Sequence, residues 1–321
     1  MQSINRRRGK SFMTGQLNRQ SDASLLNQPL WLDAPDAAQR TSVARVPEHM
    51  RKAAMDLITK GFTVLRGVQD PAVCQQAIAD FGRFCQEHPD QHAASFDEHG
   101  RERRLVNFHH YSDAAMQLGT NSDLMELLDF LFAAEASVYT SLTFKYGTQQ
   151  PVHRDTPHFA TWPDGYFFGV WVALEDIDPE AGPLFYYEGG HRFPIDVEGI
   201  WKRVCESRPD LSRDEALILA LDIYNGYVID NAPSFGDHRV ADMKRGDVAI
   251  WHPQLPHGGS PAADPSKSRW SMVFHCAPSE KQVHQHTSFF THANGEEPAP
   301  RYGFTQHYGR NVARAGDVAF Q

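Results

Sequence analysis

The sequence has few cysteines, no long apolar run and no excess of basic residues. Its four cysteines form no Cys-x-x-Cys pair, which favours reduced thiols in a cytoplasmic protein over a disulfide framework. It contains no stretch of about 18 apolar residues, so we expect neither a membrane span nor a membrane partner. Lys and Arg number 31 against 40 Asp and Glu, which gives a formal net charge of -9. Because phosphate contacts need clustered Lys and Arg, this balance argues against a nucleic-acid partner.

The length of 321 residues suits one large domain with additions at its ends. The basic stretch at 6–10 is not followed by an apolar segment, so it does not predict a secretory signal. We expect residues 1–45 to be a flexible lead-in and residues 281–321 to be a C-terminal extension. Residues 46–280 are then the folded domain, with a helical insertion at about 195–240. Nothing in the sequence indicates an oligomeric state.

The first part of this domain shows helical periodicity. Residues 46–60 predict a helix, and residues 62–67 predict a short strand. Asp70 is a good N-cap for a second helix that has Pro71 at its first position. Apolar side chains recur at helical spacing there and again at 123–134. We expect both helices to cover the outer face of a sheet.

The most informative segment is His153-Arg-Asp155, which follows a predicted strand at 138–146. Polar and apolar side chains alternate along that strand with a period of two. Residues two apart on an extended chain point to the same side, so both side chains can reach one metal ion. A helix would separate them, and the flanking Pro151 and Pro157 disfavour a helix. This segment therefore predicts half of a metal site.

A third ligand is expected about a hundred residues later. The short apolar run at 248–251 predicts a strand, and two histidines follow it, His252 and His257. We favour His257, because Gly258 and Gly259 come next and let the backbone approach a ligand closely. His252 is the alternative. Two histidines and one carboxylate form the facial set that binds non-haem Fe(II) and leaves other coordination positions open.

The next predicted strand supplies a candidate anion site. Arg269, Ser271, Val273 and His275 share one face of it. A guanidinium beside a hydroxyl suits a carboxylate, because Arg donates two parallel hydrogen bonds and Ser adds a third. An ordinary structural ion pair is the alternative for Arg269. Of the remaining histidines, His275 has the strongest claim to lie near the site.

These motifs together resemble the phytanoyl-CoA dioxygenase family of Fe(II)/2-oxoglutarate-dependent oxygenases. The resemblance covers roughly residues 50 to 280 and implies a double-stranded β-helix, a jelly roll with flanking helices. The stretches that carry the resemblance are Gly147 to Asp155, Gly169 to Asp176, Gly182 to His191, Gly246 to Ser260, and Arg269-x-Ser271.

The resemblance also implies roles for individual residues. It implies that His153, Asp155 and His257 bind iron and that Arg269 holds the distal carboxylate of 2-oxoglutarate. Relatives that halogenate lack the carboxylate ligand, so the presence of Asp155 favours hydroxylation over halogenation. Further candidates around the cosubstrate are Ser271, Trp171, Gln150 and Ser260.

The implied activity is a dioxygenase reaction that uses Fe(II), 2-oxoglutarate and O2. An aliphatic C–H bond of a small organic substrate is hydroxylated, and succinate and CO2 are released. We expect a sugar, an amino acid or a natural-product intermediate as substrate. A jelly-roll metalloenzyme of another class, an isomerase or hydrolase, would use the same ligands without Arg269. A non-catalytic binding module is the third reading.

The insertion at about 195–240 is expected to contact the substrate. It contains a predicted helix at about 213–223, which is followed by Asn225-Gly226. Local packing is the alternative role for each of its polar and aromatic side chains. The candidate contacts are Tyr224, Tyr227, Asn231 and the aromatic run Tyr166-Phe167-Phe168.

Overall fold

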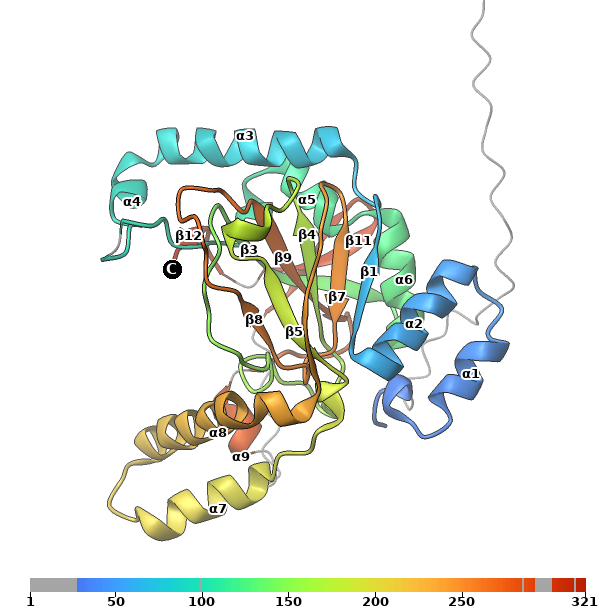
Figure 1. Cartoon of the computed structure of the whole chain (residues 1–321), viewed down its shortest axis with the longest axis vertical. Helices are drawn as coiled ribbons and strands as arrows, with labels where there is room; N and C mark the ends of the chain where they lie inside the picture. Colours follow the sequence, from blue (N-terminus) through green and yellow to red (C-terminus); the bar gives the residue numbers. More distant parts are fainter. Residues whose placement is uncertain (1–27, 99, 285, 292–301, 315) are drawn as a thin grey trace, which may run out of the picture.

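The computed structural model describes residues 28–98, 100–284, 286–291, 302–314 and 316–321. In these residues a large antiparallel sheet packs against a small one, with helices around them (Figure 1). The strands are β1 (Phe62–Leu65), β2 (Leu105–Val106), β3 (Ala136–Phe144), β4 (Phe168–Ala173), β5 (Leu184–Glu188), β6 (Asp237–Val240), β7 (Val248–Trp251), β8 (His257–Gly259), β9 (Ser271–Pro278), β10 (Phe304–His307), β11 (Arg310–Ala313) and β12 (Ala319–Phe320).

The order of the strands is that of a double-stranded β-helix. The large sheet runs β1-β7-β4-β9-β3-β11-β10, with β2 and β12 paired off this path. The small sheet runs β6-β5-β8. Between β4 and β9 the chain passes back and forth between the sheets: β4, β7 and β9 belong to the large sheet, and β5, β6 and β8 belong to the small one. The expected jelly roll with flanking helices is confirmed.

Helices pack on the outer face of the large sheet and at one end of it. They are α1 (Ala37–Val43), α2 (Glu48–Lys60), α3 (Pro71–Glu87), α4 (Pro89–Ala93), α5 (Asp113–Gly119), α6 (Ser122–Phe132), α7 (Val197–Ser207), α8 (Arg213–Phe235) and α9 (His286–Thr291), with short 3-10 turns η2 (Trp31–Asp33), η3 (Phe108–His110), η4 (Pro179–Ala181) and η5 (Gly190–Arg192).

Two apolar cores lie on either side of the large sheet. The outer core joins α2, α3, α5 and α6 to the outward side chains of β4, β7 and β9, such as Val170, Ile250 and Phe274. The inner core lies between the two sheets and includes Trp171 and Leu184. Strand alternation divides the side chains between these cores, so the inner face is left for the few polar groups described below.

The predicted N-terminal helices are confirmed. The helix expected at 46–60 is α2, and the strand after it is β1. Asp70 caps α3, since its side chain accepts a hydrogen bond from the Ala72 N–H at 2.8 Å. The helix expected at 123–134 is α6, and its leucines are buried in the outer core.

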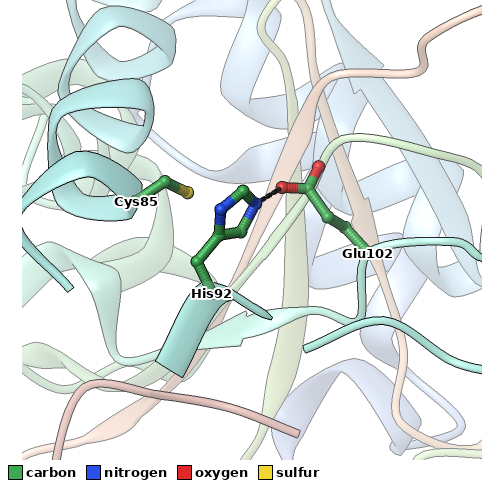
Figure 2. A group of neighbouring side chains, drawn as sticks. All are labelled: Cys85, His92 and Glu102. Carbon is green, nitrogen blue, oxygen red and sulfur yellow. Dashed lines mark hydrogen bonds and ion pairs between the residues drawn. The ribbon is translucent and has the colours of Figure 1, made fainter. Parts of the chain in front are cut away.

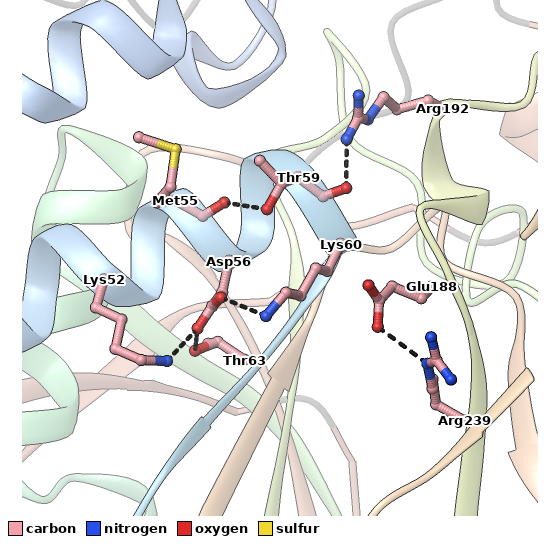
Figure 3. A network of polar contacts seen from close by, with 9 residues as sticks. All are labelled: Lys52, Met55, Asp56, Thr59, Lys60, Thr63, Glu188, Arg192 and Arg239. Atoms are coloured by element: carbon pink, nitrogen blue, oxygen red, sulfur yellow. Dashed lines mark hydrogen bonds and ion pairs between the residues drawn. The ribbon is translucent and has the colours of Figure 1, made fainter. Parts of the chain in front are cut away.

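An ion-pair network fixes the junction of α2 with β1. Figure 3 shows Asp56 between Lys52 and Lys60, with N–O distances of 2.6 Å and 2.9 Å. Burial alone would raise the pKa of Asp56, but its hydrogen bonds with the two lysines outweigh burial and lower that pKa. In the same view Arg192 donates to the Thr59 carbonyl, which ties η5 to the end of α2.

The insertion differs from its predicted form. The helix expected to end near residue 223 continues through Asn225-Gly226 to Phe235 as α8. Asn-Gly is a local turn signal, but buried side chains recur at helical spacing on both sides of it, including Ala220, Tyr224 and Val228. Packing of that stripe against α7 and α9 outweighs the cost of one helical glycine.

Both ends of the chain also differ from expectation. Residues 1–27 of the expected lead-in lie outside the described residues, but η2 and α1 fold within residues 28–45, and Leu30 and Leu32 are buried. In the expected C-terminal extension, β11 pairs with β3 and β12 pairs with β2. These strands complete the large sheet. No helix in the described residues is long and apolar enough to cross a membrane.

Candidate active site

The structure brings His153, Asp155 and His257 together. β3 ends at Phe144, so His153 follows the strand as part of a loop and not as its continuation. The His153 N–H donates to the His257 carbonyl at 2.9 Å, and the His257 N–H donates back to the His153 carbonyl at 2.9 Å. This isolated bridge fixes two residues that are about a hundred positions apart in sequence.

Backbone carbonyls orient the two imidazole rings in the same way. Nδ1 of His153 lies 2.9 Å from the Pro151 carbonyl, and Nδ1 of His257 lies 2.9 Å from the Leu255 carbonyl. A carbonyl can only accept, so each Nδ1 carries the hydrogen and each Nε2 presents its lone pair. Metal ligands are held in this tautomer when their other nitrogen is hydrogen-bonded.

Asp155 faces both free nitrogens. Its Oδ1 lies 3.9 Å from Nε2 of His153 and 3.6 Å from Nε2 of His257. The donor atoms of the three residues all lie within 4.8 Å of one another. Ligand bonds of about 2.0 to 2.2 Å place neighbouring donors about 3 Å apart, so a small inward rotation suffices. Two imidazoles and one carboxylate are the donor set that suits Fe(II).

Burial and charge keep these groups in their ligand forms. Burial lowers the pKa of His153 to about 3, so its imidazole is neutral at pH 7. Burial alone would raise the pKa of Asp155, but the neighbouring His257 and the other histidines lower it below its usual value. The carboxylate is therefore ionised where a cation would bind.

A residue that the sequence did not single out holds the second oxygen of this carboxylate. The indole Nε1 of Trp251 donates to Oδ2 of Asp155 at 2.7 Å, which leaves Oδ1 for the metal. Trp251 pairs with Gly169 across β7 and β4. A Cβ at Gly169 would lie 2.2 Å from the indole, so only glycine leaves room for this ring. A tryptophan within an apolar run gave no sign of this role.

Trp251→Phe should weaken iron binding while the protein stays folded. Loss of a partner that orients a ligand typically lowers metal affinity by about 10- to 100-fold. We expect that decrease in an anaerobic Fe(II) titration. Trp270→Phe is the matched control, because Trp270 packs on the outer face of the same sheet. Equal iron affinity in the two variants would contradict the role given to Trp251.

The alternative ligand, His252, lies elsewhere. Its Nε2 is 3.3 Å from Oδ1 of Asp33, and its ring lies 5.3 Å from that of His191. The geometry therefore favours His257. Gly258 lies close to its neighbours, because a Cβ there would approach Phe185 and the Gln150 carbonyl. The close approach of the backbone is thus to protein groups.

Arg269 and Ser271 offer unused hydrogen-bonding groups inside the molecule. One guanidinium nitrogen of Arg269 donates to the Gly182 carbonyl at 3.0 Å, and Nε has no partner among the described residues. Within the described part of the chain no carboxylate pairs with Arg269, so the structural ion pair is not seen. The Ser271 Oγ is fully buried and also lacks a partner there. Burial of such groups is costly unless a ligand satisfies them.

The other candidates around the cosubstrate lie at varying depth. Trp171 is on the inner face of β4, and its ring lies 5.9 Å from the Arg269 guanidinium. Ser260 is half-buried, and its N–H donates to the Pro183 carbonyl at 2.9 Å. Gln150 is exposed, and it is its carbonyl that accepts a hydrogen bond from Gly259 at 3.1 Å.

His275 shares the inner face of β9 with Ser271. Its ring lies 4.2 Å from Phe159 and 5.2 Å from Phe167, between centroids. Burial lowers the pKa of His275 to about 4, although the charge of Asp155 acts to raise it. Its Nδ1 has no partner among the described residues. A neutral imidazole whose Nδ1 has no partner in the described residues thus lies near the proposed metal ligand Asp155, with aromatic side chains beside it.

The candidate substrate contacts fall into two groups, those buried in a core and those that remain available to a substrate. Tyr224 is buried and packs against Phe289 and Phe290, so it is part of the local core. Tyr227 is 40% exposed, and Asn231 donates to the Tyr227 carbonyl at 2.8 Å. Tyr166 and Phe168 belong to the outer core, whereas Phe167 lies beside His275.

Arg154, between two of the proposed ligands, joins this loop to the insertion. It is buried, and one guanidinium nitrogen donates at 2.8 Å to the carbonyls of both Gly190 and Phe193. The other nitrogen lies 3.2 Å from Oε1 of Gln254, and the guanidinium lies 5.4 Å from the ring of Phe235. These contacts hold the loop against η5 and the end of α8.

Arg154→Met should destabilise the protein by about 3 kcal/mol or more, because two buried carbonyls lose a charged donor. The urea midpoint of unfolding should fall accordingly. Arg203→Met serves as the control, since Arg203 is exposed on α7 and its loss should change stability by under about 0.5 kcal/mol. A similar small effect at Arg154 would mean that the loop is held by other contacts.

The sequence was compared with known protein families. A sequence profile of the phytanoyl-CoA dioxygenase family (PhyH) matches residues 58–269, which is well over half of the chain. The chain belongs to the phytanoyl-CoA dioxygenase family. Phytanoyl-CoA dioxygenase domain-containing protein 1 of Danio rerio is 28% identical over 137 residues. That alignment spans 43% of this chain and only 42% of the curated relative.

Several solved structures share the fold of this chain. The epimerase SnoN, in complex with Fe3+, alpha ketoglutarate and nogalamycin RO, has a TM-score of 0.57 at 17% identity, over 84% of this chain and 99% of that one. The carbocyclase SnoK has a TM-score of 0.58 at 14% identity, over 84% of this chain and 97% of that one. EctD from S. alaskensis, with 2-oxoglutarate and 5-hydroxyectoine, has a TM-score of 0.53 at 17% identity, over 75% of this chain and 79% of that one. Identities this low show the shared fold alone.

Proposed function

We propose that this family member is an Fe(II)/2-oxoglutarate-dependent dioxygenase that hydroxylates an aliphatic C–H bond of a small organic substrate. The observation that carries this proposal is the convergence of His153, Asp155 and His257 with their lone pairs free. Family membership supports the same cofactors. When bound, Fe(II) with 2-oxoglutarate and O2 supplies oxidation of unactivated C–H bonds, and succinate and CO2 are released.

The residues of the chain have separate roles in binding the cofactors. His153, Asp155 and His257 would hold Fe(II), and Trp251 keeps Asp155 in position. Arg269 with Ser271 would bind the distal carboxylate of 2-oxoglutarate, since both are buried on the inner side and each has one polar atom without a partner in the described part of the chain.

Aromatic side chains lie beside the buried polar groups of the candidate site. Phe159, Phe167 and Trp171 are apolar surfaces close to His275 or Arg269. A dry pocket strengthens the charge interactions within it and protects the reaction from solvent. The helical insertion packs on the same loop, because Val152 and Trp162 contact the core of α7 and α8. We assign the choice of substrate to this side of the site.

The class of substrate follows from these surfaces only in outline. Aromatic side chains and one neutral imidazole suit a small polar organic molecule with an apolar body, such as a sugar, an amino acid or a natural-product intermediate. The fold is also that of an epimerase and a carbocyclase, SnoN and SnoK. Product analysis therefore has to distinguish hydroxylation from epimerisation and from ring closure.

Turnover of 2-oxoglutarate tests the proposal. The purified protein with Fe(II), O2 and 2-oxoglutarate should release succinate, and a panel of sugars, amino acids and natural-product intermediates should include compounds that increase the rate. Mass spectrometry of the product should then show the gain of one oxygen atom. Succinate formation with no gain of oxygen would contradict hydroxylation. Activity on a substrate without any need for 2-oxoglutarate would favour an isomerase or hydrolase.

A further inference from the structure

A second group of metal-ligating side chains lies on the outer side of the molecule. Figure 2 shows Cys85, His92 and Glu102 turned toward one another. Cys85 is near the end of α3, His92 is in α4, and Glu102 precedes β2. None of the three belongs to the candidate active site.

The donor atoms of these side chains are within reach of one ion. Nε2 of His92 lies 2.5 Å from Oε1 of Glu102, and the three donor atoms all lie within 4.8 Å of one another. Tetrahedral zinc sites place a thiolate, an imidazole and a carboxylate about 3 to 4 Å apart, at bond lengths of about 2.0 to 2.3 Å. The His92 and Glu102 side chains need only separate by about 1 Å to admit the ion.

The carboxylate is built into the protein. The Glu102 side chain is 3% exposed, and a buried carboxylate requires a compensating cation. Lys145 supplies one on the far side, since its Nζ lies 3.1 Å from Oε2 of Glu102. The two oxygens of Glu102 thus face different groups, and Oε1 remains available to a metal while Lys145 orients the carboxylate.

We propose that Cys85, His92 and Glu102 bind a second metal ion, a divalent cation of the zinc class, with the fourth coordination position open to water. The donor set favours zinc over magnesium or calcium, which take oxygen ligands and not a thiolate. Binding converts the Cys85 thiol to a thiolate and releases its proton to solvent. Since burial raises the pKa of this thiol to about 11, it stays protonated at neutral pH until the cation binds.

An ion at this site would join three elements and reach the active site indirectly. α3, α4 and the segment before β2 each contribute one ligand. Lys145, the partner of Glu102, accepts a hydrogen bond at its carbonyl from the Arg269 N–H at 2.7 Å. The ion would therefore brace the strand end that carries the proposed 2-oxoglutarate ligand, and it takes no part in the reaction itself.

Cobalt(II) tests this site separately from the iron site. A thiolate bound to Co(II) gives an intense charge-transfer absorption in the near ultraviolet, and His153, Asp155 and His257 offer no sulfur. We expect this absorption to saturate at one equivalent of sulfur-bound Co(II) in the full chain, to persist in Asp155→Ala, and to disappear when excess Zn(II) is added.

Variants then assign the sulfur. Cys85→Ser should abolish the absorption, and His92→Gln should weaken Co(II) binding at this site by about tenfold or more. Cys205→Ser is the control, because Cys205 is exposed and remote from the cluster, and it should keep the full absorption. No charge-transfer absorption at saturating Co(II) in the folded wild type would overturn the proposal. So would an absorption that Cys85→Ser leaves unchanged. The cluster would then be an ion-pair network only.

Discussion

Asp155→Ala should abolish turnover of 2-oxoglutarate and reduce Fe(II) affinity by more than about 100-fold. Loss of an outer partner already costs about 10- to 100-fold in metal affinity, so loss of the only anionic ligand should cost more. Two neutral imidazoles remain, and they do not balance the charge of the ion. Anaerobic Fe(II) titration followed by a succinate assay measures both effects.

The chain provides a matched control for this variant. Asp90 belongs to the other His-x-Asp pair, His88-Pro-Asp90, and both of its residues are exposed. Asp90→Ala should keep iron affinity and turnover at the wild-type level. If Asp155→Ala bound iron as tightly as Asp90→Ala does, the three residues that the structure brings together would not be the iron ligands.

Arg269→Leu should weaken 2-oxoglutarate binding by about 100-fold or more and leave Fe(II) binding nearly unchanged. A guanidinium that forms two charge-assisted hydrogen bonds with a carboxylate contributes about 1.5 to 3 kcal/mol for each bond, and 1.4 kcal/mol corresponds to tenfold in affinity. Anaerobic calorimetric titration of the Fe(II)-loaded protein with 2-oxoglutarate measures this change.

Two further measurements separate this effect from misfolding. Arg269→Leu also removes a donor from the Gly182 carbonyl, so circular dichroism must first show a folded protein. Arg269→Lys keeps the charge but cannot form two parallel hydrogen bonds. Its affinity for 2-oxoglutarate should therefore lie between that of the wild type and that of Arg269→Leu. Unchanged affinity for 2-oxoglutarate in both folded variants would contradict the role given to Arg269.

Period-two alternation predicted the inner wall of the site well. In the β3–β9 pairing Phe144 lies opposite Ser271 and Thr140 lies opposite His275, so the face expected from sequence is the face that points inward. Alternation depends on neighbouring residues alone, so it is readable without knowledge of the fold. The proximity of His153 to His257 was expected from motif spacing and is now seen as a backbone bridge.

Contacts that depend on the tertiary fold were not predictable. Trp251 reads as one more apolar strand residue, and only the fold directs its indole at Asp155. Arg154 reads as the variable residue between two ligands, yet it is among the largest fully buried side chains. The helix expected to end near residue 223 continues through Asn225-Gly226, because the packing of α8 overrides a local propensity.

The C-terminal strands were missed for a related reason. β11 joins β3 through a single parallel pair, Val312 with Val138, and β12 is two residues long. Segments this short carry little periodicity, so their place in the sheet depends on a partner that is distant in sequence.

The visible spectrum of the anaerobic protein with Fe(II) and 2-oxoglutarate is the sharpest test of the proposed iron site. Chelation of 2-oxoglutarate to Fe(II) held by His153, Asp155 and His257 should give a weak metal-to-ligand charge-transfer band. We expect that band in the wild type, expect it to be lost in Asp155→Ala, and expect it to require much higher 2-oxoglutarate in Arg269→Leu. Absence of the band in a folded, iron-loaded wild type would show that 2-oxoglutarate does not bind to iron in this protein.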